Sequence, residues 1–252
     1  MTKQLLLIDG NSIVFRAFFA MHNQMDKFTN KDGLHTAAIY GFKLMLDHVL
    51  QNFKPDTALV AFDAGKVTFR TKMYDDYKGG RNKTPNELTE QIPYVRELIK
   101  DSGLHSYELA NYEADDIIGT LAKQADDAGY KTLIVTGDRD LTQLASENTT
   151  VAVTHKGVTD TEHYTPAHVE EKLGITPRQI IDMKALMGDS SDNYPGVTKI
   201  GEKTAIKLVK QFGSVEELYD HIDDLKKSKM KEHLIEDEEI ARQCKPLATI
   251  LR

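Results

Sequence analysis

Acidic side chains recur in short motifs along this 252-residue chain. Asp9 follows the run QLLLI, Asp63 follows TALVAF, and Asp138 follows TLIVTG. Each run is short and apolar, as expected of a strand buried on both faces of a parallel sheet. Because ligands bind beyond the carboxyl ends of such strands, we expect the three carboxylates to share one crevice. An aspartate after a strand also often caps the next helix, but three caps in one crevice would repel each other.

Six further acids lie in three motifs. Three open a helix in the run YEADD (112–116), one follows Asp138 after a single residue, and two lie three apart in GDSSDN (188–193). A helix dipole favours acids in a first turn, so YEADD alone could reflect only that preference. The nine candidates are Asp9, Asp63, Glu113, Asp115, Asp116, Asp138, Asp140, Asp189 and Asp192. Oxygen ligands select Mg²⁺ or Mn²⁺ over Zn²⁺, and nine favour two metal ions, which typically act on phosphate esters.

The segment from Lys66 to Lys83 is basic. It contains six lysines or arginines against two aspartates, with the motifs FR (69–70) and YKGGR (77–81). A charged run of this kind is most often a solvated loop. The aromatic residues and paired glycines between the charges favour instead a mobile phosphate-binding element beside the acidic crevice.

A second basic element follows the last acidic motif. The run PGVTKIGEKTA (195–205) approaches the spacing of a nucleotide-binding P-loop, but an extra glutamate interrupts it and no strand precedes it. A hairpin between helices that presents backbone N–H groups to a phosphate fits better. Lys199, Lys203, Lys207 and Lys210 would add a basic edge.

The elements that must position these residues alternate between strands and helices. Strands are predicted at 4–8, 57–62, 132–136 and 149–153, and helices at 36–52, 85–101 and 113–128. This alternation predicts an α/β fold with a parallel sheet. After residue 164, prolines punctuate short helical segments. We therefore expect a catalytic core at 1–164 and a helical subdomain at 165–252, with the hairpin element at about 188–210.

The composition is that of a globular protein, with 40% hydrophobic and 28% charged residues. One cysteine, Cys244, excludes a disulfide framework, and no run resembles a membrane span or a signal peptide, so we expect a cytoplasmic protein. The net charge of −7 argues against nucleic acid, yet without the nine acids 30 acidic residues remain against 32 basic ones. The apolar run PLATILR (246–252) would be weakly supported at a free terminus, which indicates a fragment of a longer chain.

Together the motifs resemble one family. LIDGNS (7–12), AFDAG (61–65), YEADDIIGT (112–120), TGDRDL (136–141) and LMGDSSDN (186–193) look like the 5′-nuclease domains of bacterial DNA polymerases I, within the flap endonuclease family. The resemblance runs in order through essentially the whole chain. It implies a PIN-like twisted parallel sheet flanked by helices, a helical arch at about 66–100, and a helix-three-turn-helix DNA-binding element in the helical subdomain.

The resemblance also implies roles for the acids. Asp9, Asp63, Glu113 and Asp115 would hold a first metal ion. Asp138, Asp140, Asp189 and Asp192 would hold a second, with Asp115 near both and Asp116 acting partly through water. The two ions would be Mg²⁺ or Mn²⁺.

For the basic segments, the resemblance implies contacts with DNA. Lys78 and Arg81 would reach the scissile phosphate, Arg70 would assist, and Tyr77 would stack on a base. Arg16 matches another basic residue of the family, with a surface role left as the alternative. The hairpin residues would be Gly196, Val197, Lys199, Gly201, Lys203 and Thr204, and the family often holds a K⁺ ion there. Here Tyr194 and Thr198-Lys199 replace the more usual Ile and Pro-Gly.

The implied activity is 5′-3′ exonuclease and 5′-flap endonuclease cleavage of DNA, in primer removal, nick translation and repair. Substrates would carry 5′ flaps, nicks or 5′ ends, including RNA primers paired with DNA. We expect a monomeric bacterial protein of the cytoplasm, associated with the nucleoid, with a polymerase domain in the same chain. A stand-alone flap endonuclease is the alternative.

Three other classes are weighed against this interpretation. A haloacid-dehalogenase-type phosphatase needs a second aspartate two residues after its nucleophile, where this chain has Asn11. A PIN-type ribonuclease is usually much shorter and lacks the hairpin element. A non-catalytic DNA-binding module of a polymerase would not need nine carboxylates, and a cleavage assay with an EDTA control would decide between it and a nuclease.

Overall fold

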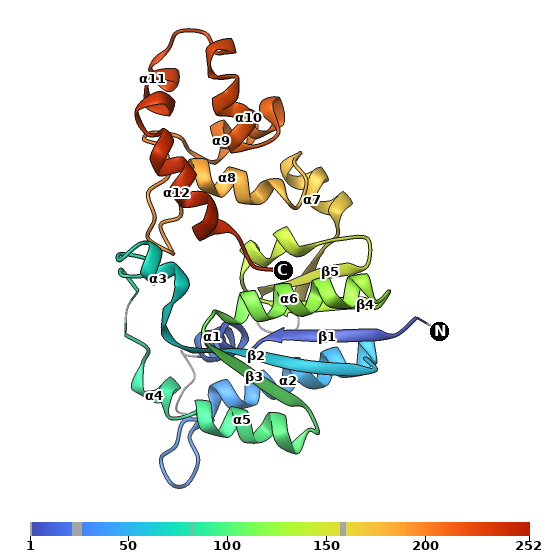
Figure 1. The fold of residues 1–252 in the computed structure, drawn as a ribbon. Helices are drawn as coiled ribbons and strands as arrows, with labels where there is room; N and C mark the ends of the chain where they lie inside the picture. Colours follow the sequence, from blue (N-terminus) through green and yellow to red (C-terminus); the bar gives the residue numbers. More distant parts are fainter. Residues whose placement is uncertain (1, 22–26, 82, 157–159) are drawn as a thin grey trace.

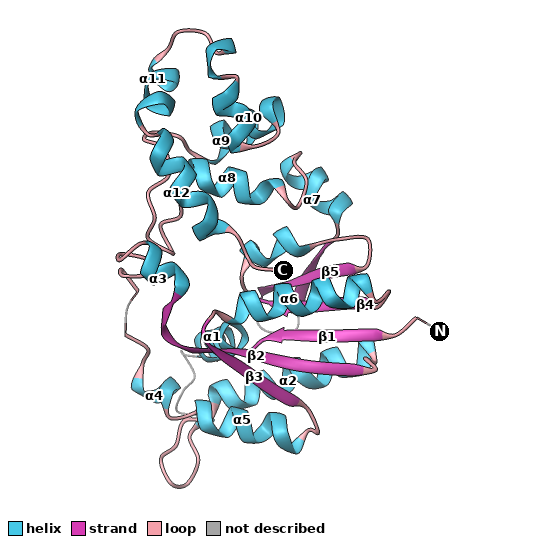
Figure 2. Cartoon of the chain, in the orientation of Figure 1, coloured by secondary structure: helices cyan, strands magenta, loops and turns pink. Residues whose placement is uncertain are grey.

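The computed structural model describes residues 2–21, 27–81, 83–156 and 160–252. Within these residues six strands form one sheet in the order β3-β2-β1-β4-β5-β6 (Figures 1 and 2). The strands are β1 (Gln4–Asp9), β2 (Thr57–Thr68), β3 (His105–Asn111), β4 (Lys131–Thr136), β5 (Thr149–Lys156) and β6 (Asp160–Tyr164). The first five are parallel and β6 is antiparallel to β5. The predicted α/β fold is confirmed.

Both faces of the sheet are covered, which explains the continuous apolar runs. On one face, Leu6 and Ile8 of β1 pack in a core shared with α1 (Gly10–Met21), α2 (Ala37–Phe53) and α5 (Ile92–Asp101). On the other face, Leu7 packs in a core shared with α6 (Ala114–Asp127) and the helical subdomain. Consecutive residues of β1 therefore face opposite cores, as the pleat of a strand requires.

Two strands escaped prediction because neither carries an apolar run. All seven residues of β3 (HSYELAN) are exposed, since this strand lies at the edge of the sheet and pairs with β2 alone. β6 forms the opposite edge. In addition, β2 continues six residues beyond the predicted end at Phe62, so Asp63 lies within the strand, where its register with β3 becomes irregular.

The segment between β2 and α5 holds the candidate arch. It contains two short helices, α3 (Phe69–Met73) and α4 (Asn86–Thr89), joined by turns. The predicted boundary at residue 100 is wrong, because α5 packs into the core of the sheet through Val95 and Ile99, which are both buried. The single helix predicted at 85–101 is divided between α4 and α5, and the fully buried Gln91 at the division accepts a hydrogen bond from the Ala38 N–H at 2.8 Å.

The rest of the chain is helical and stacks beside the sheet (Figure 1). A 3₁₀ segment, η2 (Arg139–Leu144), precedes β5; then follow α7 (Pro166–Leu173), α8 (Gln179–Met187), α9 (Glu202–Phe212), α10 (Val215–Asp220), the 3₁₀ turn η3 (Ile222–Asp224), α11 (Lys229–Glu236) and α12 (Glu238–Ala248). Between α8 and α9 the chain folds back on itself, and a Cβ on Gly196 would lie 2.2 Å from the Gly188 nitrogen. This approach requires glycine at both positions, which also have positive φ. None of the described helices is both long and apolar enough to cross a membrane.

The C-terminal segment is well packed. Leu247 and Ile250 are 5% and 4% exposed, and the Ile250 N–H donates to Gln143 Oε1 at 3.0 Å. The segment returns from α12 to lie beside α6 (Figure 1). The expectation that this apolar run is weakly supported is therefore wrong, because contacts with residues more than 100 positions earlier in the chain bury it.

Candidate active site

Four aspartates from different elements come together at the carboxyl end of the sheet. Asp9 ends β1, Asp63 lies in β2, Asp115 is in the first turn of α6, and Asp138 follows β4. We call these residues the aspartate quartet. Burial and repulsion from Asp63 and Asp138 raise the pKa of Asp9 to about 7. Burial and repulsion from Asp9 and Asp138 raise the pKa of Asp115 well above its usual value. The three carboxylates predicted to meet, Asp9, Asp63 and Asp138, thus lie close enough to act on one another, and Asp115 joins them.

Two members of the quartet also cap helices. Asp9 Oδ1 accepts the Ser12 N–H at 3.0 Å at the start of α1, and Asp138 Oδ1 accepts the Asp140 N–H at 2.8 Å at the start of η2. The hydroxyl of Thr136 donates to the second oxygen of Asp9 at 2.8 Å. Capping and convergence are therefore compatible. Asp9 and Asp138 each cap the segment that follows their strand, and both caps lie at the same edge of the sheet.

A second acidic group joins the sheet to the helical subdomain. Lys184 of α8 places its Nζ 2.7 Å from Asp140 Oδ1 and also pairs with Asp189 Oδ2. Burial and repulsion from Asp138 raise the pKa of Asp140 to about 7. Against the effect of burial, hydrogen bonds from Lys184 and Ser191 hold the pKa of Asp189 below its usual value. Lys184 was not predicted; its only signal is a lysine in the run MKALM (183–187), five residues before Asp189.

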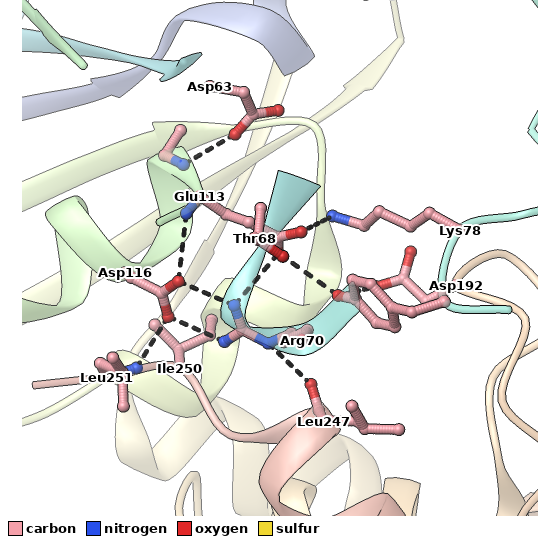
Figure 3. Close-up of polar contacts among 12 residues, drawn as sticks. Asp63, Thr68, Arg70, Lys78, Glu113, Asp116, Asp192, Leu247, Ile250 and Leu251 are labelled. Carbon is pink, nitrogen blue, oxygen red and sulfur yellow. Dashed lines mark hydrogen bonds and ion pairs between the residues drawn. The ribbon is translucent and has the colours of Figure 1, made fainter. Parts of the chain in front are cut away.

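A third group lies at the base of the candidate arch (Figure 3). Lys78 Nζ lies 2.7 Å from Glu113 Oε1, and Arg81 Nη2 lies 2.6 Å from Asp192 Oδ1. The Tyr77 hydroxyl donates to Asp192 Oδ2 at 2.9 Å. Both cations that the resemblance assigns to the scissile phosphate are therefore paired with carboxylates that it assigns to metal ions.

The structure does not support direct roles for Arg70 and Asp116. Arg70 is 2% exposed and grips Asp116 with two hydrogen bonds of 2.7 and 2.8 Å (Figure 3). Asp116 is also 2% exposed and accepts the backbone N–H of Glu113 at 3.2 Å, which is the first-turn role that the sequence left open. A carboxylate filled in this way has no oxygen to offer a metal ion, and a guanidinium buried in this way does not reach DNA.

Tyr77 likewise differs from expectation. Its ring is 4% exposed and stacks against Tyr194 with centroids 6.5 Å apart. The prediction that Tyr77 stacks on a base does not fit this arrangement, because Tyr194 and the surrounding core cover the ring.

The predicted hairpin residues divide into exposed and buried positions. Lys199, Gly201 and Lys203 are exposed and Thr204 is half-buried, whereas Gly196 and Val197 are buried. The N–H of Val197 donates to the Leu186 carbonyl at 2.8 Å, so neither this group nor the side chain of Val197 faces solvent. Gly201 caps α9 without a side-chain hydrogen bond, which leaves first-turn N–H groups of this helix for an anion.

Arg16 lies on α1, and its side chain lies beside Gly137, the residue before Asp138. Its guanidinium donates to the carbonyl oxygens of Thr154 and His155, each at 2.6 Å, and so joins α1 to β5.

The donor set suits a hard divalent cation. Among the described residues no three His, Cys, Asp or Glu side chains form a closed metal-binding group. Several acids instead hold a cation of the protein: Glu113, Asp116, Asp140, Asp189 and Asp192. The quartet differs, since no lysine, arginine or histidine of the described residues pairs with it within 4 Å. Asp9 is buried and the other three are half-buried, and their mutual repulsion is only partly offset by Lys78 acting on Asp115. Such a group of carboxylates favours a bound cation such as Mg²⁺ or Mn²⁺.

Family comparisons agree with this geometry. Residues 4–174 match the model of the 5′-3′ exonuclease N-terminal, resolvase-like domain, and residues 175–252 match the model of the 5′-3′ exonuclease C-terminal SAM fold. The chain belongs to the 5′-3′ exonuclease family. It is 60% identical over 248 residues to DNA polymerase I of Streptococcus pneumoniae and 57% identical over 249 residues to that of Bacillus subtilis. The matches cover 98% and 99% of the chain but only 28% of either polymerase.

Two solved structures share the fold. The chain superimposes on a bacteriophage T5 flap endonuclease complexed with DNA and metal ions with a TM-score of 0.80, 24% identity, and coverage of 98% of this chain and 89% of that one. The catalytic core of Rad2 in complex with DNA gives a TM-score of 0.57 at 15% identity, covering 94% of this chain and 73% of that one.

Proposed function

We propose that this member of the 5′-3′ exonuclease family is a divalent-metal-dependent nuclease that hydrolyses DNA at 5′ flaps, nicks and free 5′ ends. The observation that carries the proposal is the aspartate quartet, which has no ion pair with a protein cation among the described residues, beside an arch base that bears Lys78 and Arg81. Membership of the family and the DNA complexes of the T5 and Rad2 enzymes support it.

The quartet would hold the metal ions, with Glu113, Asp140, Asp189 and Asp192 as further ligands once their protein cations are displaced. Metal ions bound there would supply Lewis-acid stabilisation of charge on the phosphate. Lys78 and Arg81 would exchange Glu113 and Asp192 for the scissile phosphate and counter the charge that develops on it. Exposed Lys199 and Lys203 and the N-terminus of α9 would hold the duplex backbone.

The relatives indicate the protein in which this nuclease works. Because the curated relatives are DNA polymerases I and the chain spans 28% of their length, we place this nuclease in the same polypeptide as a polymerase. Its substrates would then include displaced strands and RNA primers on DNA, in the bacterial cytoplasm. A K⁺ ion at the hairpin element stays a prediction from the resemblance.

A cleavage assay on labelled duplexes tests the proposal. We expect a 5′-flap duplex to be cut at the junction in Mg²⁺, leaving a 5′-phosphate and a 3′-hydroxyl, while a matched 3′-flap duplex stays intact and EDTA stops the reaction. Tight, EDTA-insensitive binding with no cleavage of either duplex would instead establish a non-catalytic DNA-binding module.

A further inference from the structure

The last six residues, 247–252, lie against the back of the candidate active site, and we call them the C-terminal strap (Figure 3). Arg70 of α3, at the base of the arch, donates from Nε to the Leu247 carbonyl at 3.0 Å and from Nη2 to the Thr249 carbonyl at 2.6 Å. The strap is therefore joined to the arch base through main-chain oxygens. These contacts do not depend on which side chains stand at positions 247 and 249.

The Arg70 guanidinium also contacts two acids of the candidate active site, Glu113 and Asp116. Nη1 donates to Glu113 Oε2 at 3.2 Å and to Asp116 Oδ2 at 2.7 Å, and Nη2 donates to Asp116 Oδ1 at 2.8 Å. With the two strap carbonyls, these bonds use all five N–H donors of an arginine, so Arg70 has none left for a phosphate. Glu113 in turn accepts Lys78 Nζ at 2.7 Å.

Asp116 receives the strap from the other side. Its Oδ1 accepts the Leu251 N–H at 3.1 Å, while its Oδ2 accepts the Glu113 N–H at 3.2 Å. The Asp116 carboxylate thus joins the strap to Glu113, the N-cap residue of α6. Arg70 and Asp116 are each 2% exposed. A buried ion pair of this kind is stable only while every donor and acceptor keeps its partner.

The fit of the strap on α6 depends on a glycine. A Cβ on Gly119, one turn beyond Asp115, would lie 2.2 Å from the Leu251 carbonyl oxygen and 2.7 Å from Ile250 Cγ2. On the opposite side, the buried Gln143 accepts the Ile250 N–H at 3.0 Å and donates to the Ala248 carbonyl at 3.1 Å. The strap is held between α6 and η2, the two elements that carry Asp115 and Asp140.

We propose that the strap, Arg70 and Asp116 form a clamp that positions Glu113 and Lys78 for the reaction. Arg70 is then a positioning residue that acts through Glu113, and the arch base is held by main-chain groups 177 residues away in the sequence. This inference rests on the proposed function for its effect on cleavage, but the clamp itself is testable without it.

Gly119→Ala displaces the strap without altering any charged or DNA-facing residue. Alanine favours a helix interior over glycine, so α6 itself is not weakened. We expect faster hydrogen exchange at 247–252 and, through the clamp, at 69–81 and 112–116. We also expect a single-turnover cleavage rate at least about tenfold lower, with the dissociation constant for flap DNA within about twofold of wild type. Gln124→Ala, on the exposed side of α6, should leave both measurements unchanged.

Arg70 variants separate positioning from phosphate contact. Arg70→Lys keeps the charge but not the five-donor geometry, so a positioning role predicts that Arg70→Lys is as slow as Arg70→Gln. A phosphate contact predicts rescue by lysine, and a salt dependence of DNA binding reduced by about 0.9 in log–log slope in Arg70→Gln. The double variant Gly119→Ala/Arg70→Gln should be no slower than the slower single variant, because both changes open the same clamp.

The hydrogen-exchange measurement tests whether the clamp exists even if the wild-type chain cuts no DNA. Absence of cleavage by the wild-type chain would overturn the proposed function but not the clamp. Faster exchange at 112–116 after Gly119→Ala supports the clamp. Release of the strap with no change at 69–81 or 112–116 overturns it, as does an unchanged cleavage rate in a strap-released variant. If Gly119→Ala does not fold, Gln143→Leu, which removes two strap hydrogen bonds from the side of η2, is judged by the same outcomes.

Discussion

Lys184 Nζ lies 2.7 Å from Asp140 Oδ1, so that a cation from the helical subdomain neutralises a carboxylate of η2, the 3₁₀ segment between β4 and β5. The same ammonium pairs with Asp189. All three side chains are largely buried, and this arrangement occupies acids that the resemblance assigns to a metal ion. Under the proposed function, Lys184 would be displaced when a metal ion binds Asp140 and Asp189, which leads to the first prediction.

Lys184→Met should destabilise the metal-free protein by about 1–3 kcal/mol, because two buried carboxylates lose their counterion. Added Mg²⁺ should then restore more stability to the variant than to wild type. Urea unfolding with EDTA and with Mg²⁺ measures both quantities. Lys172→Met, which breaks a half-exposed pair with Glu162, serves as the control and should change stability by less than about 0.5 kcal/mol. Equal Mg²⁺ effects in wild type and Lys184→Met would contradict this account.

Asp138→Asn tests the quartet. Asparagine keeps the cap on η2, so the fold should persist, but it removes one anionic ligand. We expect the Mg²⁺-supported cleavage rate to fall by roughly 10²–10³-fold while the dissociation constant for flap DNA stays within about tenfold. Stopped-flow cleavage and fluorescence anisotropy give the two values. Full activity in Asp138→Asn would remove this residue from the site.

Lys78→Ala tests the arch. If Lys78 counters charge on the phosphate, the single-turnover rate at saturating DNA should fall by about 10²-fold or more, with little change in DNA affinity. Lys66→Ala, an exposed lysine of the same basic segment, is the matched control and should cleave at the wild-type rate. A defect confined to affinity would show that Lys78 binds DNA without acting in the chemical step.

The metal-free protein should lose stability as the pH rises from about 4 to 7. The pKa values of Asp9 and Asp140 are raised to about 7 by burial, so the folded state keeps protons that the unfolded chain has released. Mg²⁺, which binds the ionised carboxylates, should raise the melting temperature more at pH 8 than at pH 5.5. Calorimetry of wild type and of Asp9→Asn/Asp140→Asn checks this, and the double variant should show a flatter profile. A wild-type stability that rises over this range would contradict the assignment.

Lys199 at the hairpin has φ 59°, a left-handed conformation that costs most residues about 1 kcal/mol. The N–H of Thr198 beside it donates to Asp237 Oδ2 at 2.7 Å, which holds the turn in place. Lys199→Gly should therefore retain or raise stability by up to about 1 kcal/mol, while reducing the log–log salt slope of DNA binding by about 0.9. An unchanged slope would show that Lys199 does not contact a phosphate.

Much of the site follows from local sequence, because each element of it is local. The apolar runs at β1, β2 and β4 predict buried strands, and an aspartate at the end of such a strand is brought to the shared edge whatever the rest of the chain does. The helix that begins in the run YEADD could also be predicted, since acidic residues in the first turn stabilise the start of a helix.

The errors in the site have one physical cause, which is contact between distant parts of the chain. A sequence motif does not reveal that Arg70 meets Leu247, or that Lys184 lies between two acids. The charges at 70 and 116 were therefore assigned, through the resemblance, to DNA and metal, whereas each neutralises the other. β3 was missed for the opposite reason, since an exposed edge strand needs no apolar pattern.

Manganese bound to the protein in the presence of flap DNA tests the central claim most directly. Crystals grown with a non-cleavable 5′-flap duplex and Mn²⁺ should show anomalous peaks about 2.2 Å from oxygens of the aspartate quartet, with a second ion toward Asp140 and Asp189 and with Lys184 moved away. Peaks absent from the quartet, with Lys184 still paired to Asp140 and DNA in place, would contradict the account.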